Sequence, residues 1–410
     1  MIPVPVAKPD LRTAFRYARS RSGKSYLRQI AEMVRLMLGP GKLSPWDYHF
    51  FRLWDDEALS WDQKREFIGD NCHKWITHQV SNINRAESLA DKVRANAALD
   101  QAGIPTPRLQ AVYHPDRKID HAPVMRSASE LAAFLRRNID YPFFFKPVTS
   151  LMSIGAGLAV AYDPDSDSLR MHDDELVPVD DFASRVESYC RTGPSSGGGR
   201  NPQSGYLFQS VLTNHPEIAA LCGETVACLR VYLGVDDRGP RILATGWKIP
   251  APDSPADNLY RPGNFYADVD RQTGEIRRAL RGEGSALEVF ADNPYTGTRL
   301  AGRRLPHFSQ VREMVLRGAT VFPEVRYQGW DVAICAGGPR VIEVNFGSSF
   351  ILPQLASGRG LATAEFWEFV ARARKLNGQR SAAWPVSWNR SESIWRLKGV
   401  WDVSRNLLGR

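Results

Sequence analysis

The chain lacks the features of a membrane-spanning or disulfide-bonded protein. It has no run of about 18 apolar residues, which argues against a transmembrane helix. Its first ten residues, MIPVPVAKPD, do not show the basic and then apolar pattern of a signal peptide. Only five cysteines occur among 410 residues, with no CxxC pair and no regular spacing. We therefore expect free thiols in a reducing, cytoplasmic environment.

The positive charge is concentrated at the two ends of the chain. Residues 1–54 hold ten Lys and Arg against three Asp and Glu, a net +7, and residues 371–410 hold nine against two, again +7. Because the whole chain carries +8, the middle carries about −6. We therefore expect no nucleic-acid partner, since such proteins usually have a basic core face. The basic ends could contact a membrane surface or a protein partner.

The local patterns predict an α+β fold that follows a helical region. Residues 10–40 and 61–98 have helical spacing, and Ser44-Pro45 is typical of a helix start. Segments typical of strands then follow: YPFFFKPV (141–148), GLAVAYD (157–163), GYLFQSVL (205–212), CLRVYLGV (228–235) and RILATGWKI (241–249). Helical spacing returns at 309–322 and 361–376.

Two segments outside these elements have unusual compositions. Residues 193–205 are rich in Gly and Ser, which predicts a mobile surface loop. The tail 371–410 is basic and contains four tryptophans, at positions 384, 388, 395 and 401. It suits either an amphipathic helix at an interface or a C-terminal helix packed on the N-terminal region.

Residues 329–350, GWDVAICAGGPRVIEVNFGSSF, combine an apolar hairpin with polar side chains. Residues two apart in a strand face the same way, so Glu343 and Asn345 share a face. A loop with an odd number of residues, such as 337–339, would place Asp331 opposite Asn345 on that face. The other face would then be the core side, formed by Val332, Ile334, Ile342 and Val344.

Two carboxylates and an amide oxygen on one face are suitable ligands for Mg²⁺, which also binds substrate phosphates. The alternative is an exposed hairpin whose polar side chains face water. A second pattern suggests phosphate binding. Lys146 ends a strand and is followed by a loop with Gly155 and Gly157, where backbone N–H groups can approach phosphate oxygens. This loop is neither a Walker A nor a GxGxxG sequence, and an ordinary surface loop is the alternative.

The order of these motifs resembles the ATP-grasp superfamily, and most closely the sugar-transfer-associated ATP-grasp group. The resemblance extends over about residues 90–370. It is carried by LDQAGIPTP, FFFKPV with its glycine loop, LFQSVLTNHPEIAAL, CLRVYL and GWDVAI…GPRVIEVN, and continues in LYRPGNFYADVDRQTGEI, NPYTGTRLAGRRLPHFSQV and ILPQLASGRGL. The N-terminal LSPWDYHFFRLWD also looks like this group.

This resemblance implies an ATP-grasp fold, in which two α+β subdomains enclose ATP and magnesium. The chain would comprise a mainly helical region at 1–90, an ATP-grasp domain at 91–370 and the tail at 371–410. ATP would contact Lys146, Ser153 and Gly155, with Lys92 nearby. Gln209 and Val211 would lie at the hinge that contacts the adenine base.

By the same resemblance, Arg230 and Lys248 would be catalytic, and Asp331, Glu343 and Asn345 would hold Mg²⁺. Relatives have Asn and Thr where this chain has Ala227 and Cys228, which puts local substrate contacts in doubt.

The function expected from the resemblance is a Mg-ATP-dependent ligase that joins a small-molecule carboxylate to an amine through an acyl phosphate. The expected context is polysaccharide or specialised-metabolite biosynthesis. The alternatives are a phosphotransferase on the same scaffold and a non-catalytic nucleotide-binding scaffold. The sequence indicates neither the substrates nor the oligomeric state.

Overall fold

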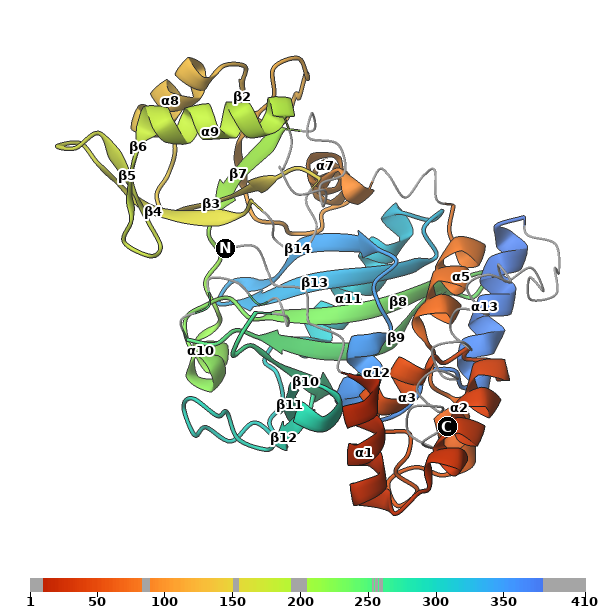
Figure 1. Ribbon diagram of the computed structural model, residues 1–410. Coiled ribbons are helices and arrows are strands. Elements are labelled where there is room, and N and C mark those ends of the chain that lie inside the picture. The colour runs from red at the N-terminus through yellow and green to blue at the C-terminus, as the bar shows by residue number, and fades with distance from the viewer. Residues whose placement is uncertain are drawn as a thin grey trace.

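The computed structural model describes residues 10–82, 89–149, 155–192, 205–252, 254, 257 and 261–378. Two seven-stranded sheets dominate it, with helices on their outer faces (Figure 1). Residues 193–204, Ser153 and the tail from 379 onward lie outside the described residues, so the predictions made for them stay untested. Within those ranges, no helix is long and apolar enough to cross a membrane.

The smaller sheet contains seven strands in the order β2-β1-β7-β3-β4-β5-β6. Their bounds are β1 Leu109–Tyr113, β2 Val124–Met125, β3 Phe143–Pro147, β4 Gly157–Asp163, β5 Ser168–Met171, β6 Leu176–Pro178 and β7 Tyr206–Ser210. Only the β1–β2 pair is parallel.

The two faces of this sheet differ because side chains alternate along β3 and β7. Phe143, Phe145 and Phe208 belong to a buried cluster with side chains of α8 (Ala128–Arg137) and α9 (Val179–Thr192). The alternate positions, Lys146 and Gln209, therefore lie on the other face, which is the face toward α7 (Lys92–Gln101) and the larger sheet (Figure 1).

The larger sheet is entirely antiparallel, in the order β12-β11-β10-β9-β8-β13-β14. Its strands are β8 Cys228–Asp236, β9 Gly239–Ile249, β10 Phe265–Val269, β11 Ile276–Arg281, β12 Glu288–Phe290, β13 Tyr327–Cys335 and β14 Gly338–Phe346. One face buries Trp247, Trp330 and Val332 in a cluster with side chains of α10 (Pro216–Cys222) and α11 (Phe308–Gly318).

The opposite face of the larger sheet is covered partly by helices from both ends of the chain. These are α1 Leu11–Ser22, α2 Tyr26–Leu38, α3 Pro45–Phe50, α4 Trp61–Arg65, α5 Asp70–Val80, α12 Ile351–Ser357 and α13 Ala364–Leu376. Tyr266 and Leu280 of the sheet share a buried cluster with α1 to α3 and α12. Tyr232 and Tyr327 share another with α5 and α13. The N-terminal helices therefore complete the core of the larger sheet.

Local signals explain where these helices begin and end. Ser44 and Asp47 form a reciprocal capping box at the start of α3, as the Ser-Pro pattern predicts. Residues 10–40 form two helices rather than one, because Gly23 takes a left-handed conformation (φ 69°) that ends α1. The five strand segments predicted between 141 and 249 are confirmed as β3, β4, β7, β8 and β9.

His49 on α3 is buried, and neither ring nitrogen has a hydrogen-bond partner among the described residues. Its ring packs at 4.8 Å from the ring of Phe15 and 5.2 Å from that of Tyr48, measured between centroids. Burial lowers the pKa of His49 to about 4. The folded protein therefore holds this ring neutral at pH values where an unfolded chain would protonate it.

We expect His49 to make the N-terminal helices acid-sensitive. Between pH 7.5 and pH 5 the unfolded state gains a proton at this residue and the folded state does not, so stability falls with pH. The pKa difference corresponds to a loss of about 2 kcal/mol over this range. Urea unfolding at both pH values should show that His49→Leu loses about 2 kcal/mol less than the wild type. The exposed His78→Gln serves as a control. An equal loss in the wild type and His49→Leu would contradict the assignment.

Candidate nucleotide and phosphoryl-transfer site

Three charged side chains from adjacent strands meet on the larger sheet. Asp331 of β13 lies directly opposite Arg230 of β8, and Lys248 of β9 is paired with Cys228, two residues before Arg230. The Arg230 guanidinium donates to both carboxylate oxygens of Asp331, at 2.6 and 2.8 Å. The Lys248 ammonium lies 3.1 Å from Asp331 Oδ1.

Asp331 uses its full hydrogen-bonding capacity in this arrangement. Its Oδ1 faces Arg230 Nε and Lys248 Nζ, while Oδ2 accepts from Arg230 Nη2 and from Asn345 Nδ2 at 3.3 Å. A carboxylate offers about four lone-pair positions, so all are occupied. Burial by itself would raise the pKa of Asp331, but Arg230 and Lys248 outweigh that effect and hold it at about 2.

Two further residues complete the cluster. Arg230 Nη1 donates to the Ser348 hydroxyl at 3.1 Å, and Lys248 Nζ lies 3.0 Å from Asp257 Oδ2. Burial lowers the pKa of Lys248, but Asp257 and Asp331 more than compensate, so it stays above its ordinary value. Neither Ser348 nor Asp257 was predicted as a site residue, and no pattern around Asp257 identifies it.

Two glycines make room for the cluster. A β-carbon on Gly329 would lie 1.8 Å from the Ser348 hydroxyl, and one on Gly246 would lie 2.1 Å from the Tyr266 hydroxyl. Both distances are far below any van der Waals contact. The larger sheet therefore needs glycine at position 329 for Ser348 to reach Arg230, and at position 246 for the Tyr266 side chain to pack against β9.

The predicted register of the β13–β14 hairpin is wrong by two residues along β14. Asp331 lies opposite Glu343, and Asn345 lies opposite Gly329. The predicted loop at 337–339 is also wrong, because Cys335 pairs with Gly338 across a two-residue turn. With a two-residue turn and regular pairing, Glu343 would lie on the face opposite to that of Asp331. A β-bulge, at the step between Asp331 and Val332, returns Glu343 to the same face as Asp331.

The bulge also corrects the predicted core face. Val341 replaces Ile342 in the buried cluster with Val332, Ile334 and Val344, while Ile342 is half-buried. The extra residue on β14 shifts the alternation after Val341. Glu343 and Asn345 share one face, as the alternation predicts, and Asp331 joins them there because it pairs with Glu343.

Helix α7 and the smaller sheet each contribute a cation to the same region. Lys92 Nζ, from the start of α7, lies 3.4 Å from Glu343 Oε1. Lys146 of β3 is only 6% exposed, and burial lowers its pKa to about 8, although the negative charge of Glu343 acts to raise it. These residues bring both sheets to one polar site.

The other residues predicted for nucleotide contact lie on or beside the smaller sheet. Gln209 of β7 pairs with Phe144, on the face that carries Lys146, and Val211 follows that strand. Gly155 adopts φ 75° and its carbonyl accepts a hydrogen bond from the Tyr206 hydroxyl at 2.8 Å. Ser153 lies outside the described residues.

The donor types fit a magnesium site at Glu343 and Asn345. The Glu343 carboxylate is 27% exposed and lies beside Lys92 of α7. No group of three His, Cys, Asp or Glu side chains suited to a metal occurs among the described residues. The proposed ligand set consists of the carboxylates of Asp331 and Glu343 and the amide of Asn345, and phosphate oxygens would supply the additional ligands. Asp331 can serve as a metal ligand only if the Asn345 amide turns its nitrogen away from the Oδ2 atom of Asp331.

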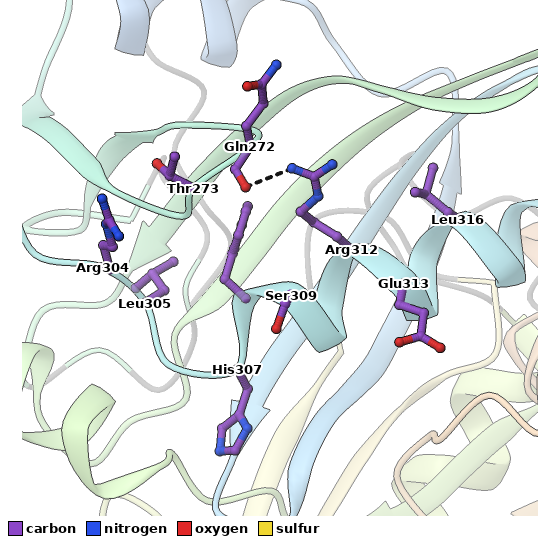
Figure 2. Close-up of a pocket in the computed structure, with 10 residues that line it drawn as sticks. Gln272, Thr273, Arg304, Leu305, His307, Ser309, Arg312, Glu313 and Leu316 are labelled. Carbon is purple, nitrogen blue, oxygen red and sulfur yellow. Dashed lines mark hydrogen bonds between the residues drawn. The ribbon is translucent and has the colours of Figure 1, made fainter.

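A hollow elsewhere on the surface is not this site. It has a volume of about 560 Å³ and lies at the start of α11, beside the turn between β10 and β11 (Figure 2). Arg312 closes one side by donating to the Gln272 carbonyl at 2.7 Å. None of the residues that line it belongs to the charged cluster.

Cations from both sheets and a carboxylate–amide hairpin are chemically suited to a ligand that carries phosphate groups. The family comparison is more specific. Residues 74–366 match the sugar-transfer associated ATP-grasp family, which is about seven-tenths of the chain. The chain belongs to this family, and the predicted ATP-grasp fold is confirmed. No curated protein matches the chain.

Three solved structures show a distant likeness to this chain. D-alanine–D-alanine ligase from Bacillus anthracis is 14% identical, with 73% of this chain and 72% of that chain covered and a TM-score of 0.39. Biotin carboxylase from Campylobacter jejuni is 10% identical, with coverage of 77% and 52% and a TM-score of 0.40. L-amino acid ligase from Bacillus licheniformis is 12% identical, with coverage of 69% and 50% and a TM-score of 0.35.

We expect Asp331→Asn to destabilise the protein more than Glu343→Gln. The first change leaves the buried Arg230 and Lys248 charges without their shared anion, which should cost about 3 kcal/mol. The second removes a partly exposed partner 3.4 Å from Lys92 and should cost less than about 1 kcal/mol. Urea unfolding at pH 7.5 measures both. Equal losses would show that Asp331 is not the main counter-charge of the cluster.

Proposed function

We propose that the protein is a Mg-ATP-dependent ligase that joins a carboxylate to an amine through an acyl phosphate. The observation that carries this proposal is the pairing of a rigid cation cluster on the larger sheet with phosphate-binding cations beside the smaller one. The first comprises Arg230 and Lys248, and the second comprises Lys92 and Lys146. These four positive charges face three negative ones, on Asp257, Asp331 and Glu343.

This charge balance supports a requirement for a divalent cation. The net excess of one positive charge is too small to neutralise a triphosphate. Glu343 and Asn345 would hold Mg²⁺, with Asp331 as a third ligand after the amide of Asn345 turns. Bound there, the ion would supply positive charge to the phosphoryl group during transfer.

In the proposed reaction, Lys92 and Lys146 hold the phosphates of ATP while a substrate carboxylate attacks the γ-phosphorus. The bond from that phosphorus to the β,γ-bridging oxygen breaks, which gives an acyl phosphate and ADP. An amine then attacks the carbonyl carbon, loses a proton and displaces inorganic phosphate. The protein mainly positions the reactants and stabilises charge during these steps.

Arg230 is suited to stabilise the oxyanion that forms as the amine attacks. Three of its N–H groups are used by Asp331 and Ser348, which fixes the guanidinium in place. Arginine has five such donors, so the remaining ones can point to substrate oxygen. Because Asp331 and Ser348 already hold it, little reorganisation is needed during the reaction. Lys248 would assist as a second, fixed cation.

The same site would serve a phosphotransferase if the acceptor were a hydroxyl group. We favour the ligase because Arg230 keeps N–H donors beyond those used by Asp331 and Ser348, and such donors suit a substrate carboxylate and its later oxyanion. We place the reaction in polysaccharide or specialised-metabolite biosynthesis, within the cytoplasm.

We expect ADP release to depend on a carboxylic acid, and hydroxylamine to capture the activated acid as a hydroxamate. The assay uses ATP, Mg²⁺ and a panel of amino acids, hydroxy acids and uronic acids. Glu343→Gln should lower hydroxamate formation about 100-fold, since it removes a charged metal ligand. The exposed Glu313→Gln, on α11, should leave it unchanged.

Other outcomes of this assay would overturn the ligase proposal. A stable phosphate ester formed without hydroxylamine or amine would identify a phosphotransferase. ATP binding without turnover across the panel would favour a non-catalytic nucleotide-binding scaffold. Full hydroxamate formation by Glu343→Gln would instead contradict the metal assignment alone.

A further inference from the structure

Helix α2 has an unusual distribution of polar and apolar side chains. Two of its polar residues, Gln29 and Glu32, are buried, with 0% and 8% exposure. The face directly opposite them carries Leu27, Ala31, Val34 and Leu38, at spacings of four, three and four residues. Leu27 is 64% exposed and Leu38 is 71% exposed, the two highest values among large apolar residues in the described ranges. This helix therefore presents an apolar stripe outward.

The inward polar residues hold the helix in this orientation. Glu32 accepts two hydrogen bonds of 2.8 Å from Lys24 and another of 2.8 Å from the Tyr48 hydroxyl. Gln29 donates to the Lys24 carbonyl at 3.1 Å. A rotation that buried the leucines would break these bonds and leave buried charge unpaired, which costs far more than two exposed leucines. The outward stripe is thus a fixed feature of the surface.

Helix α1, which precedes α2 in the chain, carries exposed basic residues. Arg12, Arg16 and Arg19 recur at helical spacing on one face of α1, and all three are exposed. The Arg19 guanidinium lies 4.9 Å from the ring centroid of Tyr26, the first residue of α2. Because Tyr26 directly precedes Leu27, this contact places Arg19 near the N-terminal end of the helix that carries the stripe.

Two acidic side chains near the stripe are paired with cations. Asp56 lies 2.7 Å from both Lys24 Nζ and Arg28 Nη2, and it also pairs with Lys64. Glu32 is paired with Lys24. The acidic residues Asp55, Glu57 and Asp62 follow in the chain, but residues 1–66 still hold twelve Lys and Arg against eight Asp and Glu, a net +4. The region is therefore positive overall.

We propose that the outward face of α2, together with the basic face of α1, docks on an anionic lipid surface. Apolar side chains bordered by arginines are the combination that binds at the interface of such membranes. A second copy of this chain would bring like charges together, and the basic tail 371–410 would do the same. An exposed apolar stripe on a water-soluble surface otherwise has no stabilising role.

The location of this face is compatible with catalysis. Figure 1 shows α1 and α2 at the end of the molecule opposite the smaller sheet. A membrane bound there would leave the region between the two sheets uncovered. Docking of α1 and α2 on a membrane does not depend on the proposed reaction.

The test is co-sedimentation of the full chain with vesicles. We expect binding to vesicles of 30% phosphatidylglycerol in phosphatidylcholine, and little binding to pure phosphatidylcholine. The double variant Leu27→Ser/Leu38→Ser should bind about tenfold more weakly. Arg12→Gln/Arg16→Gln should also bind about tenfold more weakly, and the wild-type binding should fall as NaCl rises.

The matched control is Leu176→Ser/Val289→Ser, which changes two residues of 51% and 50% exposure on other elements. It should bind like the wild type. Binding that survives Leu27→Ser/Leu38→Ser would place the membrane contact elsewhere, such as the basic tail, and overturn the proposal. Absence of vesicle binding would also overturn it. If light scattering then showed a dimer that Leu27→Ser/Leu38→Ser converts to a monomer, the stripe would be a contact between copies.

Discussion

The shared carboxylate of Asp331 is the interaction on which the proposed site depends. It holds Arg230 and Lys248 on neighbouring strands, with distances of 2.6 to 3.1 Å. Burying two cations is unfavourable unless an anion with good geometry accompanies them. The antiparallel register of β8, β9 and β13 supplies this geometry, and the glycines at 246 and 329 leave the necessary space. The rigid backbone of the sheet therefore positions the charges before any substrate binds.

The two sheets have different roles in the proposed site. The larger one carries a closed network in which charges compensate one another. The smaller one presents Lys146 in a desolvated position, where burial lowers its pKa toward 8. A buried lysine with little compensation is stabilised by an incoming phosphate, whereas the Arg230 guanidinium is already satisfied by Asp331. This contrast suits phosphate binding on one side and substrate activation on the other.

Sequence alternation predicts the shared face of Glu343 and Asn345, because side-chain direction in a strand depends on local geometry, whereas the prediction for Asp331 relied on a three-residue loop that is a two-residue turn in the structure. It does not predict the pairing of Asp331 with Glu343, since a bulge and a two-residue turn compensate each other. The Arg230–Asp331 bond joins residues 101 positions apart, so only the tertiary structure reveals it. Asp257 and Ser348 were missed for the same reason. Short apolar runs locate the strands well, whereas the packing of the N-terminal helices on the larger sheet depends on long-range contacts that no local pattern encodes.

The most direct test of the central claim is the pH dependence of ATP binding, measured by calorimetry with Mg²⁺ at pH 7.5 and 9.5. In the proposed site the Lys146 ammonium contacts phosphate. Its pKa of about 8 means that the ammonium loses its charge as the pH rises through this range. Bound phosphate shifts this deprotonation to higher pH. Wild-type affinity should fall about tenfold, whereas Lys146→Arg, which stays charged, should show little change. Equal pH dependence in the two proteins, or ATP affinity unaffected by Lys146→Met, would contradict the placement of the nucleotide between the two sheets.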